Sequence, residues 1–93
     1  MKVSEMNAHQ FAMYQEMDYW MCEEIGGAEN AMEDYKPGSE EYENAKKFLE
    51  QGHDELAKYF YNRVMSCCQE HAKFAGSDFL KERIERRLNK WGY

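Results

Sequence analysis

Two cysteines and a histidine lie close together in the second half of the chain and could ligate a metal or supply a nucleophile. Cys67 and His71 are four residues apart, so on a helix their side chains share one face and could both reach a soft metal such as zinc. Two ligands are too few for a structural zinc site, and no CxxC pair accompanies them. We therefore interpret Cys67 as a small core residue, and Cys68, His71 and the isolated His9 as residues near the surface.

The sequence lacks motifs for covalent or nucleotide chemistry. No glycine-rich oxyanion loop accompanies the cysteines and histidine, and no Walker loop or dinucleotide fingerprint occurs in the 93 residues. We therefore expect no enzymatic activity and no cofactor.

Glu24 is the most unusual acidic residue because it lies on the apolar stripe of the first helical segment. A carboxylate that faces a core usually has a partner. A turn near residue 37 would place Glu24 level with residue 51, so Glu55 would lie about 6 Å further along the facing helix, at 1.5 Å per residue. Glu24 and Glu55 are therefore candidate metal ligands, whereas a salt bridge from Glu24 to Lys58, or exposure at the edge of a bundle, is the structural alternative.

Two segments carry a family resemblance. The sequence MCEEIGGAENAM at 21–32, followed by GHDELAKYF at 52–60, resembles the two helices of small ferritin-like (rubrerythrin-like) proteins. The resemblance implies Glu24 as the first-helix ligand and Glu55 as the glutamate of a Glu-x-x-His motif. Lys58 stands at the histidine position, and a protonated lysine has no lone pair for a metal. We therefore take the resemblance as an indication of the ferritin-like helical fold, since a shared fold does not imply a shared function.

The spacing of apolar residues predicts an all-α protein with helices over about 6–35, 39–75 and 78–91, in a single domain spanning 1–93. The break at 36–39 (KPGS) makes the first two helices an antiparallel hairpin, with Ser39 as an N-cap. Gly26 and Gly27 would kink the first helix or admit a close neighbour. Two helices cannot enclose a core, so the third helix or a second copy must close it, and we expect a homo-oligomer.

Charge divides the chain by position. Residues 1–57 hold 14 acidic residues against four lysines, whereas residues 58–93 hold eight basic residues against four acidic ones. This division favours contacts with charged macromolecules. The mean hydropathy is −0.96 and the chain has no long apolar run, so we expect no contact with a membrane. Three cysteines, an odd number, favour reduced thiols and therefore a cytoplasmic protein.

The basic residues of the last helix permit two interpretations. Lys81, Arg83, Arg86, Arg87 and Lys90 are diluted by three acidic residues, so they would support only weak, salt-sensitive binding to nucleic acid. The interpretation that we favour is that this helix packs on the acidic hairpin of its own or a neighbouring chain.

Acidic residues cluster around the break between the first two helices. The predicted partner-binding residues are Glu29, Glu33, Asp34, Tyr35, Glu40, Glu41 and Glu43. Such a cluster could compete for a basic groove that normally holds DNA or RNA, and in size, acidity and aromatic content the chain resembles small phage inhibitors of nucleic-acid enzymes. We therefore predict a protein-binding module of the anti-CRISPR or anti-restriction class, with a partner that has a basic surface. The alternatives are a divergent ferritin-like metal-binding protein that uses Glu24 and Glu55, and a purely structural oligomer.

Overall fold

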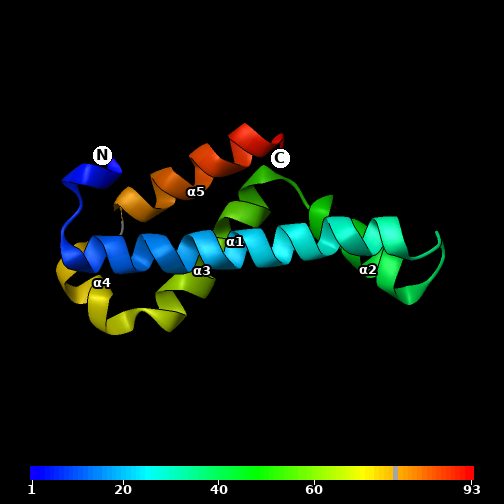
Figure 1. Ribbon diagram of the computed structural model, residues 1–93, viewed down its shortest axis with the longest axis horizontal. Helices are drawn as coiled ribbons and strands as arrows, with labels where there is room; N and C mark the ends of the chain where they lie inside the picture. The colour runs from blue at the N-terminus through cyan, green and yellow to red at the C-terminus, as the bar shows by residue number, and fades with distance from the viewer. Residues whose placement is uncertain (77) are drawn as a thin grey trace.

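The computed structural model describes residues 1–76 and 78–93, and the protein is all-α (Figure 1). A short 3-10 turn, Val3–Glu5, precedes α1, and no strand occurs in the described residues. The α-helices in this part of the chain are α1 (Ala8–Asp34), α2 (Glu40–Leu49), α3 (His53–Cys67), α4 (Gln69–Ala75) and α5 (Asp78–Trp91). None of the helices described is long and apolar enough to cross a membrane.

The predicted single helix over 39–75 is wrong, because the structure divides it into α2, α3 and α4. At the first division Gly52 has φ 106° and ψ 160°, a backbone conformation that is essentially restricted to glycine and cannot continue a helix. At the second, Cys68 has φ −119° and ψ 34°, which ends α3 and turns the chain into α4. The apolar spacing continues through both divisions, and periodicity alone therefore did not reveal them.

Local side-chain chemistry explains the helix starts. The Asn7 side chain accepts a hydrogen bond from the Gln10 backbone N–H at 2.8 Å, and the Gln10 side chain accepts one from the Asn7 N–H at 2.9 Å, which is a capping box. Ser39 Oγ accepts from the Tyr42 N–H at 3.2 Å, so the predicted N-cap of α2 is confirmed.

The Gly26–Gly27 pair does not interrupt α1. The helix continues through both residues, and a Cβ atom built on either glycine would meet nothing within 4 Å. Neither a break in the helix nor a close neighbour therefore accounts for these two glycines within this chain.

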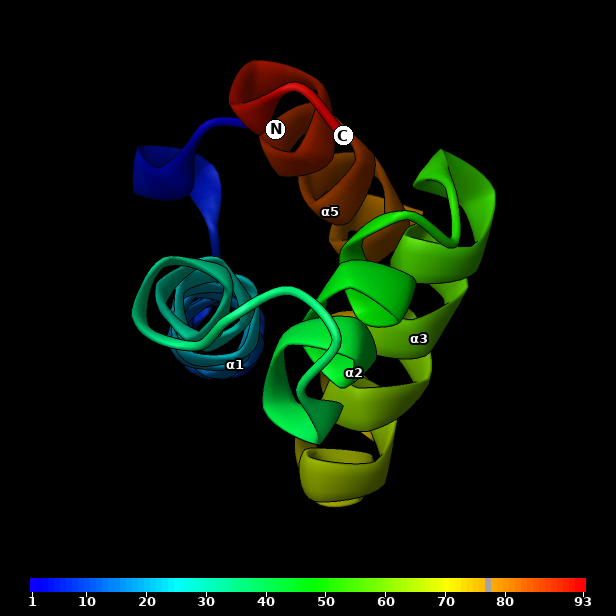
Figure 2. The same cartoon turned by 90° about the vertical axis from the view of Figure 1, so that its right-hand side faces the viewer.

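The core lies between α1, α3 and α5, which surround it when the molecule is viewed along α1 (Figure 2). The largest fully buried side chains are spaced four residues apart on each of these helices: Met13, Met17, Met21 and Ile25 on α1, Leu56, Phe60 and Val64 on α3, and Leu80, Ile84 and Leu88 on α5. The last helix therefore closes the core within one chain, and a second copy is not needed for that purpose.

The crossing of helices sets which residues meet. α2 packs against the C-terminal part of α1, whereas α3 crosses α1 obliquely (Figures 1 and 2). The molecule is elongated, at 45 × 23 × 19 Å, with the turn between α1 and α2 at one end of its long axis (Figure 1).

Candidate functional site

The turn between α1 and α2 lies at one end of the molecule (Figure 1), and the acidic residues that flank it are exposed. We name this surface the acidic end, and its members are Glu33, Asp34, Tyr35, Glu40, Glu41 and Glu43. All six are exposed, and the Tyr35 side chain, at 49% exposure, presents a large aromatic ring among the carboxylates. The chain brings these residues together because the turn is only five residues long and α2 doubles back beside α1.

Hydrogen bonds within the turn give the acidic end a defined shape. Glu43 Oε1 accepts from the Gly38 backbone N–H at 3.0 Å, and the Ser39 hydroxyl donates to the Lys36 carbonyl at 2.7 Å. Gly38 has φ 93°, a conformation that favours glycine. The carboxylates of Glu40 and Glu41 lie in the first turn of α2, where the helix dipole favours negative charge.

None of the ion pairs within residues 1–76 and 78–93 uses a residue of the acidic end. Those pairs join Glu24 to Arg63, Glu70 to Lys73, and Asp18 to Arg87. The carboxylates at this end therefore remain available for a cation from another molecule.

Glu29, the seventh predicted partner-binding residue, lies beside the C-terminus. It lines a hollow with Cys22, Gly26, Trp91 and Tyr93. Burial, and then the neighbouring Glu29 carboxylate, raise the pKa of the Tyr93 phenol. Glu29 is exposed and only one helical turn from Glu33, so it borders the acidic end.

Glu24 meets Arg63 of α3, and not Lys58 or the start of that helix. Its Oε1 lies 3.5 Å from Arg63 Nη2, its side chain is 21% exposed, and its Oε2 is buried without a hydrogen-bond partner. The Arg63 guanidinium also lies 4.1 Å from the centroid of the Trp20 ring. The prediction that Glu24 lies level with residue 51 is wrong. Because α3 crosses α1, the residue that reaches Glu24 is Arg63, further along α3.

The two predicted metal ligands therefore have different surroundings. Glu55 is exposed in the first turn of α3, whereas Glu24 is paired with a guanidinium. Burial of the phenol, and then the Glu24 carboxylate, raise the pKa of Tyr59. Within the described residues no group of three or more His, Cys, Asp or Glu side chains could hold a metal ion.

The environments predicted for Cys67 and Cys68 are wrong. Cys68 is buried and Cys67 is exposed, because α3 ends between them and the chain changes direction. His71 does not pair with Cys67: its Nδ1 lies 3.0 Å from Nδ1 of His9, which is half-buried and stacks on Phe74. The two histidines therefore join α4 to the start of α1.

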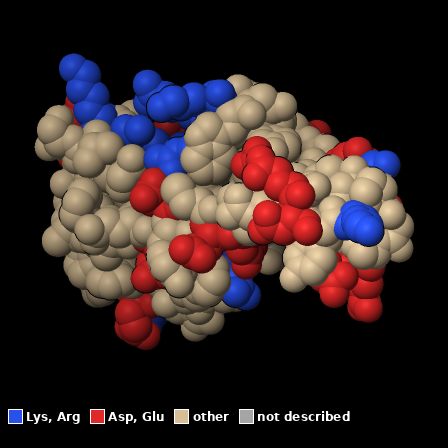
Figure 3. Space-filling model, turned by 45° about the vertical axis from the view of Figure 1, so that its right-hand side comes forward, with Lys and Arg blue, Asp and Glu red and all other residues tan. Residues whose placement is uncertain are grey.

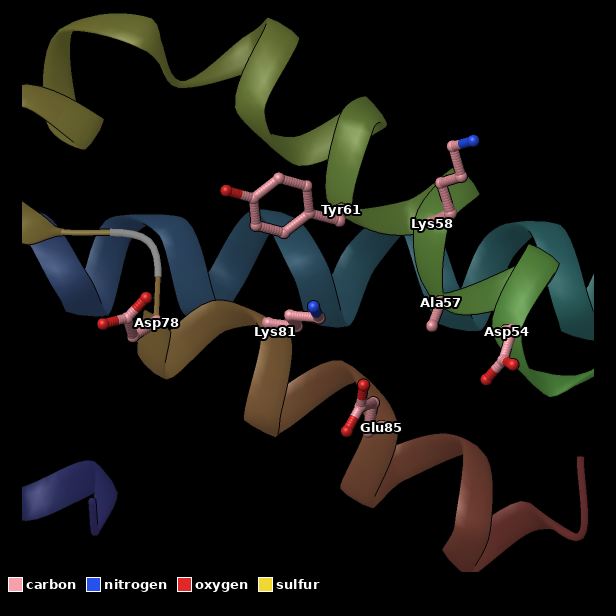
Figure 4. Close-up of a pocket in the computed structure, with 7 residues that line it drawn as sticks. All are labelled: Asp54, Ala57, Lys58, Tyr61, Asp78, Lys81 and Glu85. Carbon is pink, nitrogen blue, oxygen red and sulfur yellow. The ribbon is translucent and has the colours of Figure 1, made fainter.

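A groove between α3 and α5 is a feature that sequence reasoning missed. It has a volume of about 510 Å³, and residues of α3 line one side and residues of α5 the other (Figure 4). Each helix contributes polar residues of both charges to the lining: Asp54 and Lys58, with the neutral Tyr61, on α3, and Asp78, Lys81 and Glu85 on α5. The sequence does not show that these residues of α3 and α5 face one another, because they come together only when the two helices pack.

The basic residues of α5 contact α1 and the start of the chain. Arg87 Nη1 donates to Asp18 Oδ1 at 2.5 Å, and Arg83 Nη2 donates to the Met1 carbonyl at 2.5 Å. The last helix thus contacts the first, but at Asp18 and away from the acidic end. On the face of the molecule drawn in Figure 3, most of the lysine and arginine side chains gather at one side, and the acidic side chains are spread over the remainder.

Comparison with known proteins adds no relative. No family model, curated protein or solved structure matches this chain. The resemblance to small ferritin-like proteins therefore stays a prediction.

Proposed function

We propose that this protein is a non-enzymatic protein-binding module whose acidic end occupies a basic, nucleic-acid-binding surface of a partner enzyme. The observation that carries the proposal is that the five carboxylates of the acidic end are exposed and take no part in an ion pair within the described residues. A nucleic-acid-binding groove is lined by lysine and arginine, which pair with these carboxylates as they do with phosphates.

Tyr35 supplies a candidate anchor for that interface. Tyrosine is enriched among the residues that dominate binding energy, since its ring buries a large area and its hydroxyl forms a hydrogen bond. At 49% exposure, the ring lies among the carboxylates and has surface left to bury. The narrower form of the proposal is an inhibitor of the anti-CRISPR or anti-restriction class, whose target binds DNA or RNA.

The test compares capture of partners by the native protein and by two neutralised variants. In the first variant, four acidic-end residues are neutralised: E33Q, D34N, E40Q and E41Q. Neutralisation is preferable to reversal because a lysine in the first turn of α2 would oppose the helix dipole. The matched control neutralises four exposed acidic residues elsewhere, E5Q, E23Q, E55Q and E82Q.

Pull-downs from a bacterial lysate at low and high salt, with eluates identified by mass spectrometry, provide the measurement. We expect a nucleic-acid enzyme that is retained at low salt, is released at high salt, and is lost with the acidic-end variant but not with the control. The same enzyme should lose affinity for its DNA or RNA when the native protein is added. Equal retention by both variants would refute the proposal.

We also propose that the protein self-associates. The support is a set of exposed large apolar side chains, which are Phe11, Tyr19, Tyr35, Tyr59 and Phe74. Burial of such side chains is a common source of additional stability for a small domain. Sedimentation at several protein concentrations is the direct test, and a single monomeric species throughout would exclude self-association.

The alternative function, a ferritin-like metal protein, is supported by the sequence resemblance alone. Its test is metal analysis of protein purified without chelators. A stoichiometric amount of iron, manganese or zinc that is lost in the Glu55→Gln variant would favour it over the protein-binding proposal.

A further inference from the structure

Four cationic side chains of α5 surround a hollow against α1. The hollow has a volume of about 300 Å³ and is lined by Tyr14, Met17, Arg83, Arg86, Arg87 and Lys90. We name it the basic hollow. It lies away from the acidic end, and a ligand bound in it would be independent of the proposed function.

The charge in the basic hollow is only partly neutralised. Asp18 pairs with Arg87, whose side chain is 17% exposed and whose Nη2 also lies 3.3 Å from the Tyr14 hydroxyl. Within residues 1–76 and 78–93, neither Arg86 nor Lys90 has a carboxylate within ion-pair distance. The hollow therefore carries an excess of positive charge, which favours an anion.

Arg83 indicates what kind of anion would fit. Its Nη2 donates to the Met1 carbonyl, while its Nε is buried and has no hydrogen-bond partner. The N–H bonds of Nε and Nη2 point in parallel along one edge of a guanidinium, and this edge matches two oxygens of one oxyanion. A single carbonyl oxygen satisfies only one of the two donors, and a buried donor without an acceptor costs about 1–3 kcal/mol.

The aromatic rings beside the basic hollow argue against recognition of a nucleobase. The Arg83 guanidinium lies 5.5 Å from the Tyr14 ring centroid, and the Arg87 guanidinium lies 5.3 Å from that of Trp91. On each ring, the face that the guanidinium covers is not free to stack on a base. The hollow is therefore suited to the anionic group itself.

We propose that the basic hollow is a binding site for a phosphate group, either free or as a monoester on a small molecule. Arg83 holds two phosphate oxygens through Nε and Nη2 after the Met1 carbonyl moves aside. Arg86 and Lys90 supply additional positive charge at the rim, and Arg87 remains held by Asp18. The N-terminal segment, which lies beside the start of α5 in Figure 1, occupies the site when no phosphate is bound.

The experiment is a titration followed by proton–nitrogen NMR, which detects arginine Nε–H groups individually. Inorganic phosphate and phosphoserine are added in separate series at constant pH and ionic strength, with chloride as the reference anion. We expect a saturable shift of the Arg83 Nε–H resonance with phosphate or phosphoserine but not with chloride. Whichever of the two binds more tightly identifies the source of the group.

Matched variants test the role of the guanidinium. Arg83→Lys keeps the charge but lacks the two parallel donors, so its dissociation constant for phosphate should rise at least about tenfold. Arg63→Lys makes the same change outside the hollow and should leave the constant unchanged. If Arg83→Lys does not fold, as judged by circular dichroism, the exposed pair R86Q and K90Q replaces it, and a weakened phosphate affinity is again expected.

Three results would overturn the proposal. The first is a shift that is linear in phosphate concentration or equal to that with chloride. The second is unchanged affinity in the folded variants of the hollow. The third is binding of a single-stranded oligonucleotide, with steep salt dependence, by a protein that binds neither phosphate nor phosphoserine, because that would identify an extended polyanion surface.

Discussion

Replacement of the two adjacent glycines of α1 by alanine should stabilise the protein. Gly26 and Gly27 have helical conformation, and a Cβ atom at either position would meet nothing within 4 Å. The substitutions therefore add neither a clash nor a contact, and only the helix propensity changes. Alanine is favoured over glycine by about 0.8–1.0 kcal/mol in a helix interior, so the double variant should gain about 1.6–2 kcal/mol. For a domain of this size that corresponds to a rise in Tm of roughly 6–16 °C.

Urea unfolding followed by far-UV circular dichroism measures this gain as a shift in the transition midpoint at unchanged slope. Gly52→Ala is the contrasting variant. Its Cβ also meets nothing within 4 Å, but φ is 106° at this position, so backbone strain should destabilise the protein by about 1–3 kcal/mol. A loss of stability in the double variant of α1 would refute the reasoning, because such a loss would mean that another group packs closely on these glycines. If that loss grew with protein concentration, a second copy would be the neighbour.

The remaining predictions concern buried and paired groups. Burial is the main cause of the raised pKa of the Cys68 thiol, so the other two thiols should react with a thiol reagent at pH ~8 while Cys68 reacts only on unfolding. Because its pKa is raised in the folded state, Cys68 contributes stability that is lost as the pH rises through the folded value. Phe60→Ala should cost about 3–5 kcal/mol in urea unfolding because the ring is fully buried, and Phe60→Leu should cost clearly less. Arg63→Ala should destabilise the protein by more than Glu24→Gln does, since the guanidinium packs on Trp20 as well as pairing, and the pair alone is worth only about 0.2–1 kcal/mol at this exposure. An equal or larger cost of Glu24→Gln would contradict that ranking.

The sequence was sufficient to predict those features that depend on residues close together along the chain. Proline and glycine before Ser39 end α1 and start α2, and Ser39 caps the new helix with its own hydroxyl. The acidic end follows directly, because its residues flank one short turn and are brought together however the remaining helices pack. The same holds for the all-α class and for the apolar face of α5, both of which depend on periodicity.

The divisions of 39–75 mark the limit of local sequence signals. The apolar spacing continues past Gly52, and only the positive φ at this residue shows that the helix is interrupted before α3. Cys68 gave no signal, since cysteine has no strong preference for a helix end. Its burial, and the contact of His71 with His9 in place of Cys67, result from the change of direction at that residue.

Tertiary structure alone decided which charges meet. The crossing of α3 over α1 gives Glu24 the guanidinium of Arg63, and the packing of α5 on α3 forms the mixed-charge groove (Figure 4). The basic hollow arises in the same way, from the placement of α5 beside Tyr14 and Met17 of α1. Periodicity determines which face of a helix is buried, but the angle and register at which two helices cross depend on side chains packed from distant parts of the chain.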